Sequence, residues 1–217
     1  MNVLRILIAD DHDLLRRGVK TLLQSHAGWE ICGEAASGRE AVTKVEKLKP
    51  DIAILDISMP DLNGVDAAKR IRRISPETEI LMLSNHYSDH LILDILKMGV
   101  RGYIVKSDSD RDLAIAVETL ANHQPFFTPR ATELILRNYN QGETVNLTEP
   151  ITKNLTTRER EIVQLIAEGK SCKEVASSLF ISVKTAETHR GNIMRKLQLH
   201  TRTELVRYAM RNRMIDP

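Results

Sequence analysis

The sequence predicts an α/β fold in which a five-stranded parallel sheet is doubly wound with helices, followed by a small all-α domain. Over residues 1–120 of the 217-residue chain, short apolar runs alternate with longer amphipathic segments, the pattern of βα units in a parallel sheet. Over residues 156–212 the apolar spacing is helical throughout. Charge separates the same two parts. Residues 1–120 hold 16 Lys and Arg against 19 Asp and Glu, a net −3, whereas residues 151–217 hold 13 against 7, a net +6, which suits a polyanionic partner.

The strands of the first part are predicted from apolar runs of strand length, at residues 5–9, 30–34, 52–55, 80–83 and 102–105. A segment with helical spacing follows each strand, at residues 14–25, 38–48, 64–74, 87–98 and 110–121. Parallel strands need crossover connections of about a dozen residues, usually helical. Five strands that alternate with helices therefore predict a sheet with both faces covered.

Between the two parts, residues 123–152 are predicted to be a linker. The stretch NYNQGETVNLTEPITKN is polar and contains Gly142 and Pro150, a composition typical of flexible connections. Near the start of the predicted linker, RATELILRN (residues 130–138) has the spacing of a short helix. The predicted domains are therefore residues 1–122 and 153–217.

Four helices are expected in the second part. TTREREIVQLIAEG has a capping threonine, an early acid and a closing Gly169 around an apolar stripe. SCKEVASSLF is a second, short helix, SVKTAETHRGNIMRKLQ is a third that Ser182 caps, and RTELVRYAMRN is a fourth. Two short helices joined by a turn, the second of them capped, predict a helix-turn-helix.

Composition bears on the cellular compartment. No apolar stretch approaches the roughly 18 residues that span a bilayer. Acids occur as early as Asp10, too soon for a secretory signal, and the two cysteines, Cys32 and Cys172, lie far apart without metal-ligand spacing. We therefore expect a reducing, cytoplasmic location.

Polar groups follow the ends of the predicted strands: Asp10 and Asp11 after the first, Asp56 after the third, Ser84 after the fourth and Lys106 after the fifth. Strand ends at one edge of a parallel sheet converge, and ligands bind there. Three carboxylates form a hard-oxygen site suited to Mg²⁺, which explains how two adjacent acids are tolerated. A carboxylate beside a divalent cation and an ammonium suits phosphoryl transfer, with Asp56 as the in-line nucleophile that becomes an acyl phosphate.

The array of Asp10-Asp11, Asp56 within LDISMPDLNG, Ser84 and GYIVK ending at Lys106 resembles the receiver domain of bacterial two-component response regulators, a flavodoxin-like fold. The resemblance covers residues 3–122. It implies that Asp56 accepts phosphate from a phosphohistidine on a sensor kinase. It also implies Mg²⁺ bound by Asp11, Asp56 and the backbone carbonyl of Ser58, with Asp10 in support.

The same resemblance implies a switch pair, Ser84 and Tyr103, in which the hydroxyl moves onto the phosphoryl group and the ring turns inward. Two positions depart from the family pattern. Ser84 stands where many members have threonine, and Ser107 follows the lysine where many have proline. Neither departure removes a chemical group that the site needs.

The helix predicted at residues 183–198 is amphipathic at 100° per residue. Ala186, Ile193 and Leu197 share the inward face, and the opposite face mixes donors, acceptors and cations, which is what major-groove recognition needs. Residues 153–214 resemble the LuxR-type DNA-binding domain, and its combination with a receiver is typical of the NarL/FixJ class.

The resemblance assigns candidate DNA contacts to this helix. Those that match the family's base-reading positions are Glu187, Thr188 and Gly191; because Gly191 has no side chain, Asn192 is added. The candidates for phosphate contacts are Lys184, Thr185, Arg190 and Arg195. His189 is expected to pack or to contact backbone. The final helix, at residues 202–212, corresponds to the usual dimer surface, so two half-sites about one helical turn apart are expected.

The favoured interpretation is a transcriptional regulator, not an enzyme, whose DNA binding as a homodimer is switched by phosphorylation, with a sensor histidine kinase, promoter DNA and RNA polymerase as partners. An alternative is a phosphatase of the haloacid-dehalogenase type, but such enzymes usually have an acid two positions after the nucleophile, where this chain has Ser58. Two others are a DNA-binding protein whose receiver takes no phosphate and a quorum-signal sensor, which would lack the acidic pocket. The kinase, the promoters, the sign of regulation and any docking of the domains stay open.

Overall fold

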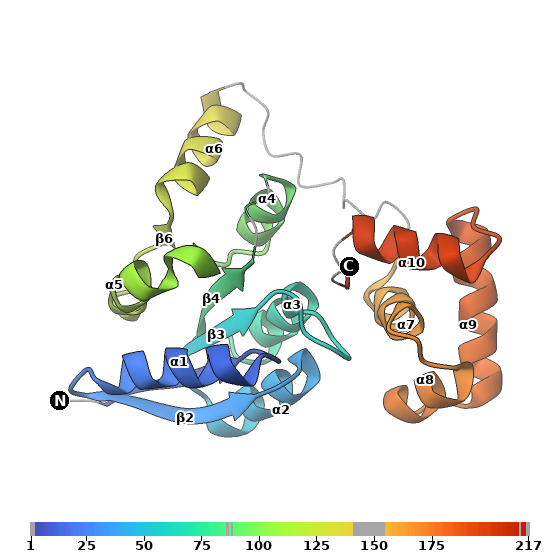
Figure 1. Ribbon diagram of the computed structural model, residues 1–217, viewed down its shortest axis with the longest axis horizontal. Helices are drawn as coiled ribbons and strands as arrows, with labels where there is room; N and C mark the ends of the chain where they lie inside the picture. The colour runs from blue at the N-terminus through green and yellow to red at the C-terminus, as the bar shows by residue number, and fades with distance from the viewer. Residues whose placement is uncertain (1–2, 86, 88, 141–154, 213, 216–217) are drawn as a thin grey trace.

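The computed structural model describes residues 3–215 except 86, 88, 141–154 and 213 (Figure 1). It contains a six-stranded, entirely parallel sheet in the order β2-β1-β3-β4-β5-β6. The strands are β1 (Leu4–Ala9), β2 (Trp29–Ala35), β3 (Ile52–Asp56), β4 (Glu79–Ser84), β5 (Gly102–Val105) and β6 (Phe126–Phe127). The helices that connect and follow them are α1 (Asp13–Gln24), α2 (Gly38–Leu48), α3 (Gly64–Ile74), α4 (Asp89–Lys97), α5 (Ser109–Ala121), which a 3₁₀ turn (Lys106–Asp108) precedes, and α6 (Pro129–Asn140).

Helices cover both faces of the sheet, which confirms the doubly wound prediction. Along β1, Ile6 and Ile8 enter one core with residues of α1 and α5, whereas Leu7 and Ala9 enter the other with residues of α2, α3 and α4. All four side chains are fully buried. Alternate strand residues face opposite sides, so an uninterrupted apolar run can feed two cores only where both faces are covered.

The prediction of five strands was one short. β6 lies in the segment expected to be a linker and pairs in parallel with β5, with Gly102 opposite Phe126 and Tyr103 opposite Phe127. α6 follows, and its buried Ala131 belongs to the same core as Tyr103. A two-residue strand has too little apolar alternation to be recognised in sequence; it forms because the edge of β5 offers it backbone partners. The exact domain boundaries stay a prediction.

The second domain contains α7 (Thr157–Ala167), α8 (Cys172–Leu179), α9 (Val183–Lys196) and α10 (Arg202–Arg211) around one aliphatic core. α7, α8 and α10 each begin with a reciprocal capping box, formed by Thr156 with Glu159, Ser171 with Glu174 and Thr201 with Glu204. Ser182 caps α9 as predicted, because its hydroxyl accepts a hydrogen bond from the Thr185 amide at 3.0 Å.

Across the described parts of both domains, the structure holds no helix that combines the length and the apolar character needed to cross a membrane.

Candidate functional site

The carboxyl ends of β1, β3 and β5 bring together three side chains that the sequence predicted to meet. The Lys106 Nζ lies 2.8 Å from Asp10 Oδ2 and 3.0 Å from Asp56 Oδ1. The three side chains are nearly inaccessible, with 10%, 2% and 1% of their surfaces exposed. Charges this deeply buried are stable only when they are paired, so the ammonium serves as a counter-ion for both acids.

The remaining acid, Asp11, lies at the rim with His12. The His12 amide donates a hydrogen bond to Asp10 Oδ1 at 2.8 Å, and its Nδ1 lies 3.1 Å from Asp11 Oδ1. Potential ligand atoms of Asp10, Asp11, His12 and Asp56 all lie within 4.8 Å of one another. The sequence analysis did not predict His12 as a site residue. Its position directly after Asp10 and Asp11 was the one feature of the sequence that could have indicated it.

The donor set fits Mg²⁺. Carboxylate oxygens are the ligands that this ion prefers, and Asp56 Oδ2 is a buried oxygen for which the described residues provide no hydrogen-bond partner. Ser58, whose carbonyl was predicted to be a ligand, lines the same cavity as Asp11 and His12. The chain can therefore supply oxygen ligands to a divalent cation at this edge of the sheet.

Burial raises the pKa of Asp56 from 3.8 to about 6; the nearby Lys106 lowers it in part, and Asp10 raises it further. Burial by itself would lower the pKa of Lys106, but the charges of Asp56 and Asp10 raise it above its ordinary value. In the metal-free protein at neutral pH, the buried, ionised Asp56 thus destabilises the folded state, and a bound cation would offset this destabilisation.

We expect this destabilisation to appear as a pH-dependent difference in stability between the wild type and Asp56→Asn. Because the folded-state pKa of Asp56 is raised, the folded protein binds the proton more tightly than the unfolded chain. The contribution of the protonated carboxyl group to the free energy of unfolding is therefore complete below pH 3.8 and is lost as the pH rises through about 6. Asp56→Asn has no carboxyl group to ionise at this position, so its free energy of unfolding does not fall in this way. The free energy of unfolding of the variant minus that of the wild type should therefore increase by about 3 kcal/mol between pH 3.8 and about pH 6. Urea unfolding of both proteins in EDTA measures it, and an advantage that is constant with pH would contradict the prediction.

The loop after β3 begins at the acid itself. It turns back onto α3, where the Gly64 amide donates to the Ile57 carbonyl at 2.8 Å. A Cβ on Gly64 would lie 1.9 Å from the Asp56 carbonyl oxygen. Asn63 caps α3 by accepting from the Asp66 amide at 2.9 Å. Backbone contacts therefore couple the position of Asp56 to the shape of the loop from residue 57 to residue 63.

Ser84 and Tyr103, the predicted switch pair, lie on adjacent strands. Ser84 ends β4 and is 3% exposed, and the Tyr103 side chain is fully buried in the core between the sheet and α4. β5 pairs with β4 so that Tyr103 lies opposite Met82 and Val105 lies opposite Ser84. In this structure the ring is therefore turned inward.

α7 of the second domain contacts the loop after β3, which the sequence left open (Figure 1). The Gln164 side chain is buried; its amide nitrogen donates to the Met59 carbonyl at 2.8 Å, and its Oε1 accepts from the Asn63 amide at 2.9 Å. The Asp61 amide donates to Glu168 at 3.1 Å. Side chains of α7 thus replace water as partners of the loop backbone.

Charged pairs extend this contact. Glu161 is 1% exposed and pairs with Arg70 of the first domain and, at 3.1 Å, with Arg158 of its own helix. Arg160 lies 3.1 Å from the buried Asp66. A second contact zone surrounds a cavity of about 520 Å³, whose lining includes Met210 and Met214 of the second domain and Asp11 and Ser58 of the first. The second domain therefore lies over the mouth of the acidic pocket.

α9 is amphipathic as predicted. Ala186 and Ile193 are buried, and His189 is half-buried. The exposed positions include every predicted DNA contact: Lys184, Thr185, Glu187, Thr188, Arg190, Gly191, Asn192 and Arg195. The helix lies at the edge of the molecule far from the sheet (Figure 1). The contact between the domains leaves this face open.

Each of the two domains matches a known protein family. The family "response regulator receiver domain" matches residues 6–118, and the family "bacterial regulatory proteins, luxR family" matches residues 153–209. The chain is similar to the oxygen regulatory protein NreC of Staphylococcus carnosus, with 37% identity over 98% of this chain and 100% of that protein. The response regulator protein VraR of Staphylococcus aureus is 36% identical over 98% of this chain and 99% of its own length.

Among solved structures, RcsB of Salmonella enterica serovar Typhimurium, bound to a promoter in the presence of the phosphomimetic BeF₃⁻, superposes with a TM-score of 0.58 at 25% identity. The superposition covers 95% of this chain and 98% of that one.

Proposed function

Because the chain belongs to the response regulators of the NarL/FixJ class, which join a receiver domain to a LuxR-type DNA-binding domain, we propose that it regulates transcription under the control of phosphorylation at Asp56. The observation that carries this proposal is the pocket in which Lys106 contacts both Asp10 and Asp56, within the same chain as an exposed helix-turn-helix face.

The phosphoryl donor is a phosphohistidine of a sensor histidine kinase. A carboxylate oxygen of Asp56 attacks the phosphorus, the bond from phosphorus to the histidine nitrogen breaks, and the electron pair stays on the imidazole, so an acyl phosphate forms. The Lys106 ammonium pairs with the oxygens of the transferred phosphoryl group and neutralises part of their charge. Mg²⁺, when held by Asp11, Asp56 and the Ser58 carbonyl with Asp10 in support, supplies the rest of that neutralisation.

The phosphorylated site acts on the rest of the chain by two routes. The Ser84 hydroxyl donates a hydrogen bond to the phosphoryl group, and the buried Tyr103 ring occupies the volume behind Ser84. The loop after β3, which begins at Asp56, changes the backbone groups that it presents to Gln164. The contact of the Ser84 hydroxyl with the phosphoryl group and the contacts of the loop with Gln164 differ between the two states, which is the condition for a population shift.

The released second domain binds promoter DNA as a homodimer through α10, with α9 in the major groove. Glu187, Thr188 and Asn192 read bases beside Gly191, while the flanking cations and Thr185 contact phosphates. Two domains read half-sites about one turn apart. RNA polymerase is the partner downstream, and the cytoplasm is the compartment where kinase, DNA and polymerase are all accessible.

Footprinting on genomic fragments with Mg²⁺, with and without beryllofluoride, tests this function. The phosphate analogue is expected to strengthen protection of paired half-sites, because it favours the state that releases the second domain. Identical footprints in both conditions would contradict phosphorylation control and favour a DNA-binding protein whose receiver takes no phosphate. Sustained hydrolysis of p-nitrophenyl phosphate by the pure protein would instead support the phosphatase alternative.

A further inference from the structure

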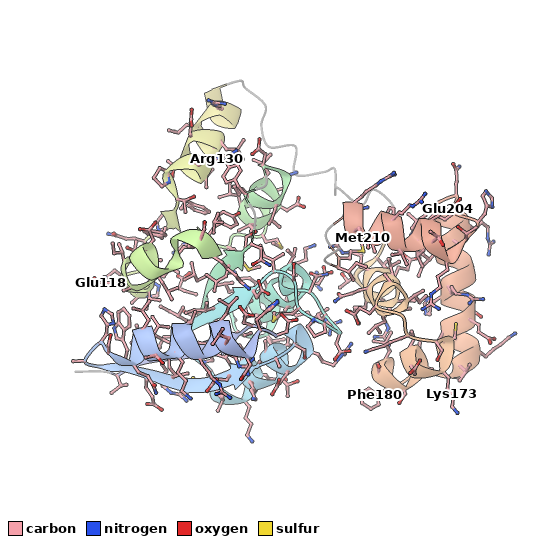
Figure 2. All side chains as sticks on the ribbon, in the orientation of Figure 1. Glu118, Arg130, Lys173, Phe180, Glu204 and Met210 are labelled. Carbon is pink, nitrogen blue, oxygen red and sulfur yellow. The ribbon has the colours of Figure 1, made fainter. Side chains whose placement is uncertain are left out.

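A groove on the second domain lies beside the exposed face of α9. It has a volume of about 740 Å³ and is formed by the turn between α7 and α8, one side of α9 and the start of α10. Figure 2 labels Lys173 and Glu204, in the first turns of α8 and α10, and both lie on the α9 side of the domain. The groove shares Glu187, Arg190 and Gly191 with the predicted DNA-contacting face, so the two surfaces are continuous.

The groove is basic. Lys170, Arg190, His200 and Arg202 line it, and Glu187 is the only carboxylate among its lining residues that the structure describes. Arg202 has a structural role, because its guanidinium donates to the Ile166 carbonyl at 3.1 Å at the end of α7. Within the described part of the chain, the side-chain cations of Lys170 and Arg190 make no such contact with the backbone, so they are the groups available to an anion.

The receiver domain already binds one of these cations. The Lys170 ammonium pairs with the Asp61 carboxylate in the loop after β3, and it also lies 4.0 Å from Glu168 Oε2 of its own domain. Lys170 and Asp61 are not deeply buried: their side chains are 29% and 36% exposed. A partly exposed pair of this kind contributes little and is readily exchanged for another anion.

We propose that this groove holds a phosphate group of the DNA backbone between Lys170 and Arg190, and that Asp61 withholds Lys170 from it while the domains are docked. The inference rests on the proposed DNA binding and adds to it a contact outside α9. In helix-turn-helix domains the first helix crosses the DNA backbone while the second lies in the major groove. Here α8 is the first helix, and Ser171 and Cys172 at its start line the groove.

The receiver and DNA therefore compete for one lysine. Movement of the loop after β3, which begins at the phosphoacceptor, separates Asp61 from the Lys170 ammonium, which is then available to a phosphate in the groove that Lys170 lines. Phosphorylation would then add a DNA contact as well as free the domain. Because a phosphate contact is independent of sequence, the effect can be measured without knowing the promoter.

The experiment measures binding of the full-length, unphosphorylated protein to a fluorescein-labelled random-sequence duplex of about 30 base pairs, roughly three helical turns, by anisotropy over a range of salt concentrations. Asp61→Asn removes the receiver's hold on Lys170, and asparagine tolerates the left-handed backbone at this position, where φ is 65°. It is expected to tighten binding roughly two- to fivefold, the range of an exposed ion pair. The control is Glu77→Gln, an equal charge change at an exposed receiver position, which should leave affinity unchanged.

The DNA contact is isolated by comparing Asp61→Asn with the double variant Asp61→Asn/Lys170→Gln, because the pair between the domains is absent from both. The double variant is expected to bind more weakly, and its slope of log affinity against log salt should be shallower by about 0.9 per lost contact. The affinity ratio of the two should thus shrink about 3.5-fold per contact between roughly 50 and 200 mM salt. Lys47→Gln in the Asp61→Asn background removes an exposed cation from the last turn of α2, outside the DNA-binding domain, and should keep the slope.

Equal affinities and slopes for the single and double variants would overturn the phosphate site. Equal affinities for Asp61→Asn and Glu77→Gln would overturn the competition with the receiver. If the wild type fails to bind duplex DNA with or without beryllofluoride, the proposed function itself fails, an outcome distinct from either of these.

Discussion

Replacement of Asp56 by asparagine is expected to abolish the incorporation of radiolabelled phosphate from acetyl phosphate. The carboxamide is a poor nucleophile and cannot form the acyl phosphate, whereas its size and shape match the carboxylate in a site that is fully buried. Lys106 keeps Asp10 as a partner at 2.8 Å, so the pocket should persist. Labelled protein, separated by gel electrophoresis after incubation with Mg²⁺, provides the measurement.

The matched control is Asp89→Asn, which makes the same change at an exposed position in the first turn of α4. It should be labelled as the wild type is. Label that still enters Asp56→Asn through an acid-stable, base-labile bond would show that another carboxylate is the acceptor, and the assignment would then have to be abandoned.

Gly64→Ala is expected to destabilise the first domain by about 3 kcal/mol or more, at the upper end of overpacking effects. The added Cβ would lie 1.9 Å from the Asp56 carbonyl oxygen and 3.0 Å from the Ile57 Cα. These are backbone atoms of β3 and its loop, so no flexible side chain can move aside. Relief requires displacement of the phosphoacceptor, and we expect acetyl phosphate labelling to fall together with stability. Urea unfolding followed by far-UV circular dichroism measures the first effect.

Gly18→Ala serves as the control for this substitution. Gly18 lies within α1, and a Cβ there would meet nothing within 4 Å. Alanine in a helix interior is favoured over glycine by up to about 1 kcal/mol, so the control should be at least as stable as the wild type. Similar losses for the two variants would indicate that the close approach at Gly64 does not constrain the site.

Much of the acidic pocket could be predicted from sequence because its groups follow strand ends. Asp10, Asp56 and Lys106 are far apart in the chain, but the alternation of strands and helices allows one parallel sheet whose carboxyl ends share an edge. The structure confirms that these three side chains meet. His12 was missed because an exposed histidine next to two acids has no strand-end position of its own.

The amphipathic face of α9 was also predictable, since 3.6-residue periodicity assigns Ala186 and Ile193 to the inside without reference to any other helix. β6 was not. Its two residues, Phe126 and Phe127, form a strand only because β5 presents an unpaired edge beside them. That edge exists after the sheet has assembled, and no local pattern encodes it.

Local patterns of apolar spacing, capping residues and acids at strand ends were thus sufficient for the order of elements and for the chemistry of the pocket, because each depends on residues close in sequence or on a general property of parallel sheets. The contact between the domains is different in kind. Gln164 meets Met59, and Glu161 meets Arg70, across more than 90 positions of chain. Each of these groups would be equally satisfied by water or by another partner, so only the packing of two folded surfaces selects the pairing.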